Sequence, residues 1–258
     1  MGLIQQEFKI SKGKDFETKI FKGKRMVTIT QDNVAIAEAM IRNDSDYIHM
    51  SDSSFGKSAA CYLSELREIY ETEKRGEKTT QNVKAIIKNA VIALDNENST
   101  HLNSDGVGRD EIPERIYKVY TEGRLFDLLK NPGQEYELFH IIEKKTHPKE
   151  KNKRARINTS FASKFCHYAS FFVFEGRAEQ DNYSIWDSIL INMLPLYLDY
   201  YKIDSKEFKP NNKDYAKYQD IIKTILDKAE KESGTRISRN GFDHLIWYYY
   251  KGRMELYK

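Results

Sequence analysis

The stretch from Asn158 to Asp187 constrains this chain most, because it opens with apolar and aromatic residues at helical spacing. Its first half, NTSFASKFCHYASFF, predicts a buried helix that begins near Thr159. Lys164 is the one lysine in the stretch and stands inside this apolar run. A lone amine among aromatic side chains costs free energy unless it loses its proton, reaches solvent or performs chemistry. The sequence therefore leaves two interpretations of Lys164 open, a snorkelling lysine and a catalytic one.

Asp187 opens a second apolar run, SILINMLPLYLDYY, which predicts a helix that Pro195 bends. An aspartate at a helix start often serves only as a cap, since its carboxylate accepts the free backbone N–H groups. If Asp187 and Lys164 point into one cleft, they form an amine nucleophile and a carboxylate that can steer it. For the catalytic interpretation, we expect the two side chains to approach within a few ångströms of each other.

Nearly all of the chain after residue 30 has the apolar spacing of amphipathic helices, so we predict a mainly α protein. Residues 1–30 instead alternate polar and apolar side chains, which predicts short strands or an extended arm. One helical pattern contains Gly123, where we expect a break. Besides the helices that begin near Thr159 and Asp187, helices are predicted in segments 33–43, 57–75, 81–96, 113–129, 135–145, 209–234 and 238–253.

Composition and cysteine usage exclude several classes of protein. The 258 residues can form one large domain or two small ones. Cys61 and Cys166 do not lie in a CxxC pair, so we expect no zinc or iron–sulfur site, and we predict no other metal or cofactor. No apolar run reaches membrane-spanning length, and the first residues lack the apolar segment of a signal peptide. We therefore predict a cytoplasmic protein in a reducing compartment, without a membrane partner.

A strongly basic run lies directly before the predicted central helix. Residues 144–156 carry seven positive charges against the single negative charge of Glu150. Clustered lysine and arginine attract a phosphate backbone and bind it with little regard to sequence. A solvated loop is the alternative interpretation. The basic residues of the run are Lys144, Lys145, Lys149, Lys151, Lys153, Arg154 and Arg156.

Two segments resemble the base-excision DNA glycosylases of the helix-hairpin-helix superfamily, most closely the bacterial proteins with an 8-oxoguanine DNA glycosylase fold. The family has a Ser-Phe-Ala-Ser-Lys helix and then a Tyr-Pro-Ile-Tyr-Asp-Ser-like segment. Here the corresponding residues are Ser160 to Lys164 and Tyr183 to Ser188. The ending FDHLIWYYYKGR is similar to the family's C-terminal Asp-x-x-Leu-Trp-Tyr helix, through Asp243, Leu245, Trp247 and Tyr248.

The resemblance covers about residues 136–258, whereas residues 1–110 resemble no family that we recognise. It implies a glycosylase-like helical part at 136–258, preceded by a helical part at 31–135 and the segment 1–30. Two positions differ from the family pattern. The turn before the lysine, RARINT, has no glycine, and Ser184 replaces the usual proline.

The resemblance implies a reaction and a role for each residue. Lys164 aligns with the lysine that attacks the sugar C1′, and Asp187 with the aspartate that assists the attack and stabilises the cationic sugar. The amine then forms a Schiff base, which permits strand cleavage by β-elimination. Burial among Phe161, Phe165 and Tyr168 is expected to lower the pKa of the Lys164 amine and free it for attack.

The target base must leave the duplex to be reached, so we expect a pocket with aromatic walls and a basic surface for double-stranded DNA. An oxidised purine is one possible substrate. A modified base in foreign DNA is another, since members of this broad group can defend against phage. The expected pocket residues are Phe161, His167, Tyr168, Tyr183 and Trp186, and the expected DNA-binding residues are Lys149, Lys151, Lys153, Arg154, Arg156 and Ser160.

Two alternatives to an enzyme stay open. The missing glycines favour a catalytically silent module with a glycosylase-like fold that binds DNA or another protein. A helical partner in a multi-protein system is the other alternative. Residues 1–110 are the expected site of any protein partner, because the resemblance assigns them no task.

Overall fold

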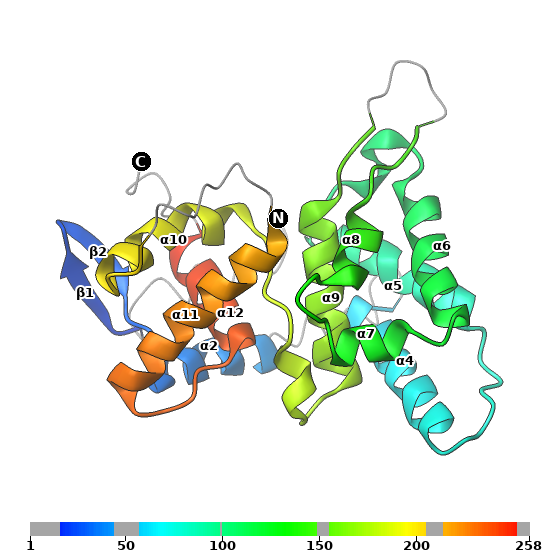
Figure 1. Cartoon of the computed structure of the whole chain (residues 1–258), viewed down its shortest axis with the longest axis horizontal. Helices are drawn as coiled ribbons and strands as arrows, with labels where there is room; N and C mark the ends of the chain where they lie inside the picture. Colours follow the sequence, from blue (N-terminus) through cyan, green and yellow to red (C-terminus); the bar gives the residue numbers. More distant parts are fainter. Residues whose placement is uncertain (1–15, 44–56, 99, 149–154, 205–213, 252–258) are drawn as a thin grey trace. The chain divides into compact units, whose positions relative to one another are not determined.

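The computed structural model describes residues 16–43, 57–98, 100–148, 155–204 and 214–251 (Figure 1). Over these residues the protein is mainly helical, which confirms the predicted fold class at that level. By its internal contacts the chain divides into two compact units. The lysine unit, which contains Lys164, comprises residues 47–183, and the aspartate unit, which contains Asp187, comprises residues 1–46 and 184–258. These two units are defined by contacts between residues, whereas the predicted ranges 1–30, 31–135 and 136–258 were defined by sequence patterns.

The lysine unit is built around one enclosed helix, α9 (Thr159–Val173). The other helices of the unit are α4 (Ala59–Lys74), α5 (Val83–Asn98), α6 (Gly108–Thr121), α7 (Leu125–Lys130) and α8 (Glu137–Glu143), with short 3-10 turns η2 (Leu102–Asp105) and η3 (Ala178–Asp181). Helix α9 contacts α4, α5, α7 and α8, and Figure 1 shows α8 and α9 side by side. From Thr159 to Ser170 every residue except Ser160 is buried, as expected for a helix that is apolar on all sides.

The predicted helix 113–129 is two helices, α6 and α7, and it starts earlier than predicted. Gly123 adopts a positive φ of 71°, which ends α6 and confirms the expected break. Helix α6 begins at Gly108, five positions before Pro113, the residue that the sequence pattern suggested as its start. Asp110 and Glu111 lie in its first turn, where negative side chains stabilise the positive end of a helix.

The described part of the aspartate unit combines four helices with a β-hairpin. Its strands are β1 (Thr18–Phe21) and β2 (Lys24–Val27), and its helices are α2 (Gln31–Asn43), α10 (Ser188–Tyr200), α11 (Tyr215–Ser233) and α12 (Arg239–Tyr250). The strands pair antiparallel with Lys19 opposite Met26, so short strands do form within the predicted segment 1–30. This hairpin is the one sheet among the described residues.

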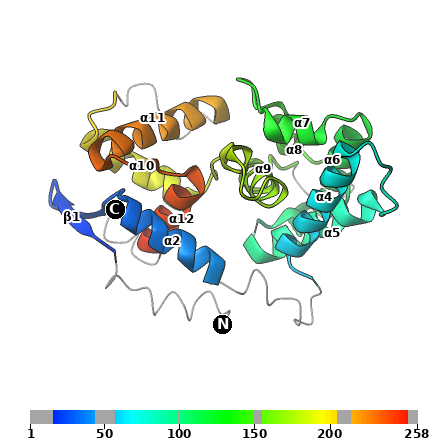
Figure 2. The same cartoon turned by 90° about the horizontal axis from the view of Figure 1, so that it is seen from below.

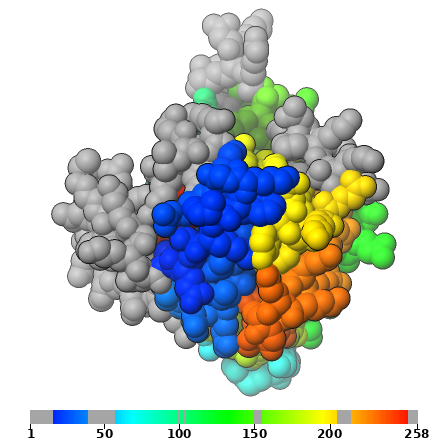
Figure 3. All heavy atoms as spheres, turned by 90° about the vertical axis from the view of Figure 1, so that its left-hand side faces the viewer, coloured from blue at the N-terminus to red at the C-terminus, as the bar shows by residue number. Residues whose placement is uncertain are grey.

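The β-hairpin lies against α10 and α11, as Figure 3 shows in blue, yellow and orange. The Lys22 amine is 2.5 Å from the Asp199 carboxylate on α10. The Lys19 amine lies 3.5 Å from the centre of the Tyr200 ring. In the interior, the Tyr197 hydroxyl donates to the Val27 carbonyl oxygen at 2.9 Å. The hairpin is therefore an integral part of this unit rather than a free arm.

Helices α2 and α12 pack closely, and Figure 2 shows them side by side. Gly241 lies at their contact. A Cβ at this position would be 2.3 Å from Val34 Cγ1, which is closer than side chains approach. The glycine is therefore needed for the close approach of the two helices. Ser238 caps the start of α12, and its Oγ accepts the Gly241 N–H at 2.9 Å.

Candidate functional site

A short hairpin joins α8 to α9 and leads directly to the helix that carries Lys164. We call residues 144–147 and 155–158 the hairpin stem. Its two sides meet in an antiparallel bridge between Thr146 and Arg156, with a hydrogen bond of 3.1 Å from Thr146 N–H to the Arg156 carbonyl oxygen. The hydroxyl of Thr159 donates to the Glu143 carboxylate at 2.6 Å. The end of α8 and the start of α9 are thus fixed to each other.

Helix α6 holds one side of the hairpin stem. The Arg115 guanidinium donates to the carbonyl oxygens of Lys144 at 2.6 Å and Lys145 at 2.8 Å. It also pairs with the Glu111 carboxylate at 2.8 Å, and Glu111 accepts the backbone N–H of His147 at 3.1 Å. Because these bonds go to backbone atoms, they fix the path of the stem and leave the side chains of Lys144 and Lys145 exposed.

Arg156 holds the other side of the stem. Its guanidinium donates to the carbonyl oxygens of Thr100 at 2.8 Å and His101 at 2.7 Å, and to Ser104 Oγ at 2.9 Å. Asp95, which is buried, fixes the same loop by accepting the Thr100 hydroxyl at 2.5 Å. Arg156 was predicted to contact DNA, and in the structure its side chain ties the stem to this loop.

The hairpin stem exposes both cationic and apolar side chains. Lys144, Lys145 and His147 are exposed, and Ile157 is a large apolar side chain with 41% of its surface exposed. Ser160, predicted to bind DNA, is half-buried at the start of α9. The other predicted DNA-binding residues, Lys149, Lys151, Lys153 and Arg154, lie outside the described residues.

Lys164 lies in the interior of the lysine unit with 8% of its surface exposed. Its amine donates to the carbonyl oxygen of Asn98, the last residue of α5, at 3.4 Å. The C-terminal end of a helix carries partial negative charge and favours a cation. Phe161 and Phe165 are buried and stack on each other with ring centres 6.3 Å apart. The amine therefore has a polar partner that the sequence did not predict, and the effect of the aromatic side chains on its pKa stays a prediction.

Three further predicted pocket residues lie in the interior of the lysine unit. His167 bonds through Nδ1 to the Tyr183 carbonyl oxygen at 2.7 Å, and its ring meets Tyr168 edge-on at 5.0 Å. The Tyr183 hydroxyl donates to the Leu128 carbonyl oxygen at 2.7 Å, and burial raises the pKa of this phenol well above its ordinary value. These contacts account for the burial of the three side chains, and their contact with a base stays a prediction.

Asp187 caps α10, as one of its two interpretations required. Its carboxylate accepts the Ile189 N–H at 2.8 Å, and its backbone is extended. The preceding residue, Trp186, is buried and packs on Tyr218 with ring centres 4.9 Å apart. Capping uses one carboxylate oxygen and does not exclude a second task for Asp187. Lys164 and Asp187 belong to different units, so their approach to each other stays a prediction.

The segment before Asp187 is held by side chains that the sequence patterns did not identify. Ser184 is buried, and its N–H donates to Gln219 Oε1 at 3.2 Å. The Tyr215 hydroxyl donates to the Ser184 carbonyl oxygen at 2.6 Å. Arg239 donates to Gln219 Oε1 at 2.8 Å and to Ser184 Oγ at 3.3 Å. Partners 31 to 55 residues away leave no periodic signal, so the sequence did not indicate which side chains hold this segment.

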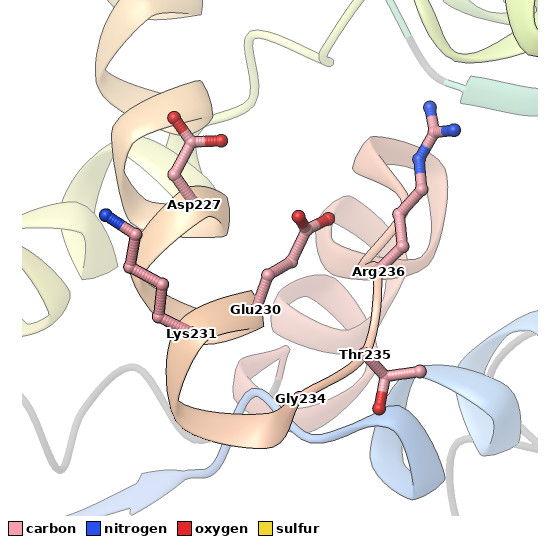
Figure 4. Close-up of a pocket in the computed structure, with 6 residues that line it drawn as sticks. All are labelled: Asp227, Glu230, Lys231, Gly234, Thr235 and Arg236. Atoms are coloured by element: carbon pink, nitrogen blue, oxygen red, sulfur yellow. The ribbon is translucent and has the colours of Figure 1, made fainter.

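A pocket of about 450 Å³ lies elsewhere in the aspartate unit and contains no predicted site residue. Figure 4 shows its wall, with residues from the end of α11 and the loop before α12. Glu230 is partly engaged, because its Oε1 accepts the Ile237 N–H at 2.7 Å. The lining side chains carry both signs of charge and do not form a constellation for catalysis. They are Asp227, Glu230, Lys231, Gly234, Thr235 and Arg236.

Comparison with protein families, with curated proteins and with solved structures finds no match for this chain. Every helix in the described part of the chain is too short or too polar to cross a membrane. Over the same residues, no group of three or more His, Cys, Asp or Glu side chains is arranged to hold a metal ion.

Proposed function

We propose that this protein is a DNA glycosylase with AP lyase activity, which excises a damaged or modified base through a Schiff base on Lys164. The observation that carries the proposal is the position of this amine. It is buried on α9, in the second turn after a hairpin stem that exposes Lys144 and Lys145. A basic hairpin that leads into a helix with an interior amine supports contact with a phosphate backbone close to a nucleophile.

The proposed reaction assigns Asp187 and Lys164 successive tasks at one nucleotide. As the base leaves with the electrons of the glycosidic bond, positive charge grows on the sugar, and the Asp187 carboxylate stabilises it. The neutral Lys164 amine then bonds to C1′, loses a proton and forms the Schiff base as the sugar ring opens. Loss of a C2′ proton expels the 3′ phosphate, and water releases the protein. The proposal requires both side chains to face the same nucleotide in the DNA complex.

The substrate class within this proposal is double-stranded DNA with either an oxidised purine or a modified base of foreign DNA. Both reach the amine only when the nucleotide is extruded from the stack. Repair of damaged DNA and defence against phage DNA are therefore two uses of one chemistry, and a screen of duplexes with different modified bases separates them.

Borohydride trapping tests the proposal directly. The full chain is incubated with duplexes that contain an abasic site, 8-oxoguanine or one of several modified bases, with borohydride present to reduce any Schiff base. We expect a covalent protein–DNA adduct with at least one duplex and none with unmodified DNA or without borohydride. If no duplex in the panel yields an adduct or a released base, the enzyme proposal fails.

A catalytically silent binding module is the second candidate, and the contact of Lys164 with Asn98 favours it. The amine is 3.4 Å from a carbonyl oxygen at the C-terminal end of α5, where an ammonium ion is stabilised. A lysine held this way can serve structure alone. DNA binding without an adduct, with affinity that falls steeply between two salt concentrations, is the expected result for a DNA-binding module. A protein-binding module should show no such affinity for DNA.

A further inference from the structure

We propose that Tyr218 and Asp243 are positioning residues for Asp187, because together they bind both polar groups of the Ile185 backbone two residues before it. This inference rests on the proposed function for its effect on rate. Its structural part, the fixing of Asp187 at the start of α10, can be tested without any activity.

The two side chains hold Ile185 from both sides. Its N–H donates to the Asp243 carboxylate at 2.7 Å, and its carbonyl oxygen accepts the Tyr218 hydroxyl at 2.5 Å. Asp243 is 1% exposed and Tyr218 is fully buried. Ile185 lies outside any helix or strand, so its buried polar groups depend on side chains for hydrogen bonds. These two bonds therefore decide the path of the backbone into Asp187.

Tyr218 interacts with three consecutive residues, 185 to 187, each in a different way. It bonds to Ile185, its ring packs against Trp186 at 4.9 Å, and its phenol lies in the electric field of Asp187. Burial, and then the negative charges of Asp243 and Asp187, raise the pKa of this phenol well above its ordinary value, while Arg239 opposes the shift. The hydroxyl consequently stays protonated at neutral pH and remains a hydrogen-bond donor.

The consequence for catalysis is geometric. A carboxylate that stabilises a cationic sugar must be held near its productive position, since a displacement of about 1 Å can cost a large factor in rate. The cap bond to Ile189 orients the Asp187 side chain, whereas the bonds at Ile185 place its backbone. Tyr218 and Asp243 do not need to touch the substrate to affect the reaction.

A double-mutant cycle tests this proposal. Tyr218→Phe removes the hydroxyl and keeps the ring, and we expect base release in a single turnover to slow by about 3- to 10-fold, as for the loss of one hydrogen bond, with the Kd for DNA unchanged. In an Asp187→Asn background the same change should have no further effect, because the residue it positions has lost its charge. Additive losses in the cycle would overturn the positioning role.

Tyr197→Phe is the matched control. It also removes a buried hydroxyl from the aspartate unit, one that bonds to Val27 far along the chain from Asp187. We expect no change in base release beyond that of overall stability. Asp243→Asn adds a rescue test, since its amide oxygen can still accept the Ile185 N–H, whereas Asp243→Ala cannot. Asn should retain more activity than Ala if acceptance of this bond is the task of Asp243.

Amide hydrogen exchange tests the structural part independently of activity. We expect the Ile189 N–H, which Asp187 caps, to exchange about 3- to 10-fold faster in Tyr218→Phe than in the unchanged protein and in Tyr197→Phe. Equal exchange in all three proteins overturns the proposal even if the enzyme is active. Faster exchange in a protein that yields no adduct with any duplex supports the positioning and contradicts only the proposed function.

Discussion

The two side chains at the centre of the proposed reaction are held by different kinds of structure. Lys164 is carried by a regular helix that is enclosed by its neighbours, and its amine reaches a carbonyl oxygen at the end of α5. Asp187 follows an irregular segment whose backbone is bound by side chains of α11 and α12. Packing positions the lysine, whereas a hydrogen-bond network positions the aspartate.

This difference determines how each position should respond to substitution. A packed helix keeps its backbone when one side chain is replaced, so changes at Lys164 should act mainly through the lost amine. A network of hydrogen bonds transmits the loss of one partner to the others, so Asp187 should depend on the side chains that bind the Ile185 backbone. Substitutions in the two units can therefore show whether packing positions Lys164 and hydrogen bonds position Asp187.

The largest expected effect is at the amine. Lys164→Ala should abolish the borohydride-trapped adduct, because the proposed Schiff base forms on this amine. Lys164→Met replaces the lysine with an unbranched apolar side chain of similar length. It should also abolish the adduct, with less disturbance of the packing of α9. Lys118→Ala is the control, since it removes a lysine on α6 that is 79% exposed and lies outside the hairpin stem, and it should leave the yield of adduct in place. An adduct that persists in both Lys164 variants assigns the nucleophile to another amine.

The next effect is at the carboxylate. Asp187→Asn keeps an oxygen for the Ile189 N–H and should leave α10 and DNA binding intact. It removes the charge that stabilises the sugar cation, so base release should slow on the order of a hundredfold or more. Single-turnover rates of base release check this. A rate equal to that of the unchanged protein would leave Asp187 as a helix cap alone.

The sequence predicted those structural features that depend on residues close to them in the chain. Apolar spacing identified the helix that carries Lys164, and the aspartate at the start of the second apolar run identified the cap at Asp187. The positive φ of Gly123 likewise follows from the absence of a side chain at that position. In each case the physical reason lies within a few residues of the feature.

The sequence did not predict the interactions that join distant segments. Arg115 binds the hairpin stem 29 residues away, and Asp243 binds Ile185 across 58 residues. Nothing in a periodic pattern indicates which arginine or aspartate will meet a backbone oxygen or N–H. Arg156 illustrates the same limit, because a basic residue in a basic run is expected to bind phosphate, yet its guanidinium binds Thr100, His101 and Ser104.

A smaller effect is expected from Glu97 in the lysine unit, next in sequence to the Asn98 that binds Lys164. Its carboxylate accepts the Ala59 N–H at 2.7 Å, and burial raises its pKa from 4.5 to about 7. A raised carboxyl pKa means that the folded protein holds the proton more tightly than the unfolded chain. Stability should therefore fall as pH rises from about 4.5 to 7 and then level off.

Glu97→Gln mimics the protonated acid and should remove this loss. We expect it to match the unchanged protein near pH 4.5 and to exceed it above pH 7 by on the order of 2 kcal/mol in the free energy of unfolding. Denaturant unfolding at several pH values measures the difference. Glu114→Gln, at an exposed position on α6, is the control and should show no such trend. Parallel curves for Glu97→Gln and the unchanged protein would contradict the prediction.

The smallest expected effect tests whether the lysine unit also contains a positioning network, at the hairpin stem. Arg115→Ala removes the donors to the carbonyl oxygens of Lys144 and Lys145, so the stem should lose its fixed path. Affinity for duplex DNA should fall by about 3- to 10-fold, as for the loss of one or two hydrogen bonds. Lys118→Ala removes one positive charge from the same helix at a side chain that is 79% exposed, and should change the affinity less. Binding is measured as the Kd at two salt concentrations.

Arg115→Lys separates geometry from charge at this position. A lysine keeps the positive charge, but its single ammonium group cannot reproduce the fork that binds two carbonyl oxygens and Glu111 together. If the stem is positioned by this fork, the lysine variant should bind DNA almost as weakly as the alanine variant. If Arg115 acts only by its charge, lysine should restore the affinity, and Lys118→Ala should weaken binding as much as Arg115→Ala. That second outcome would restrict positioning by hydrogen bonds to the aspartate unit and make the contrast between the two units sharper.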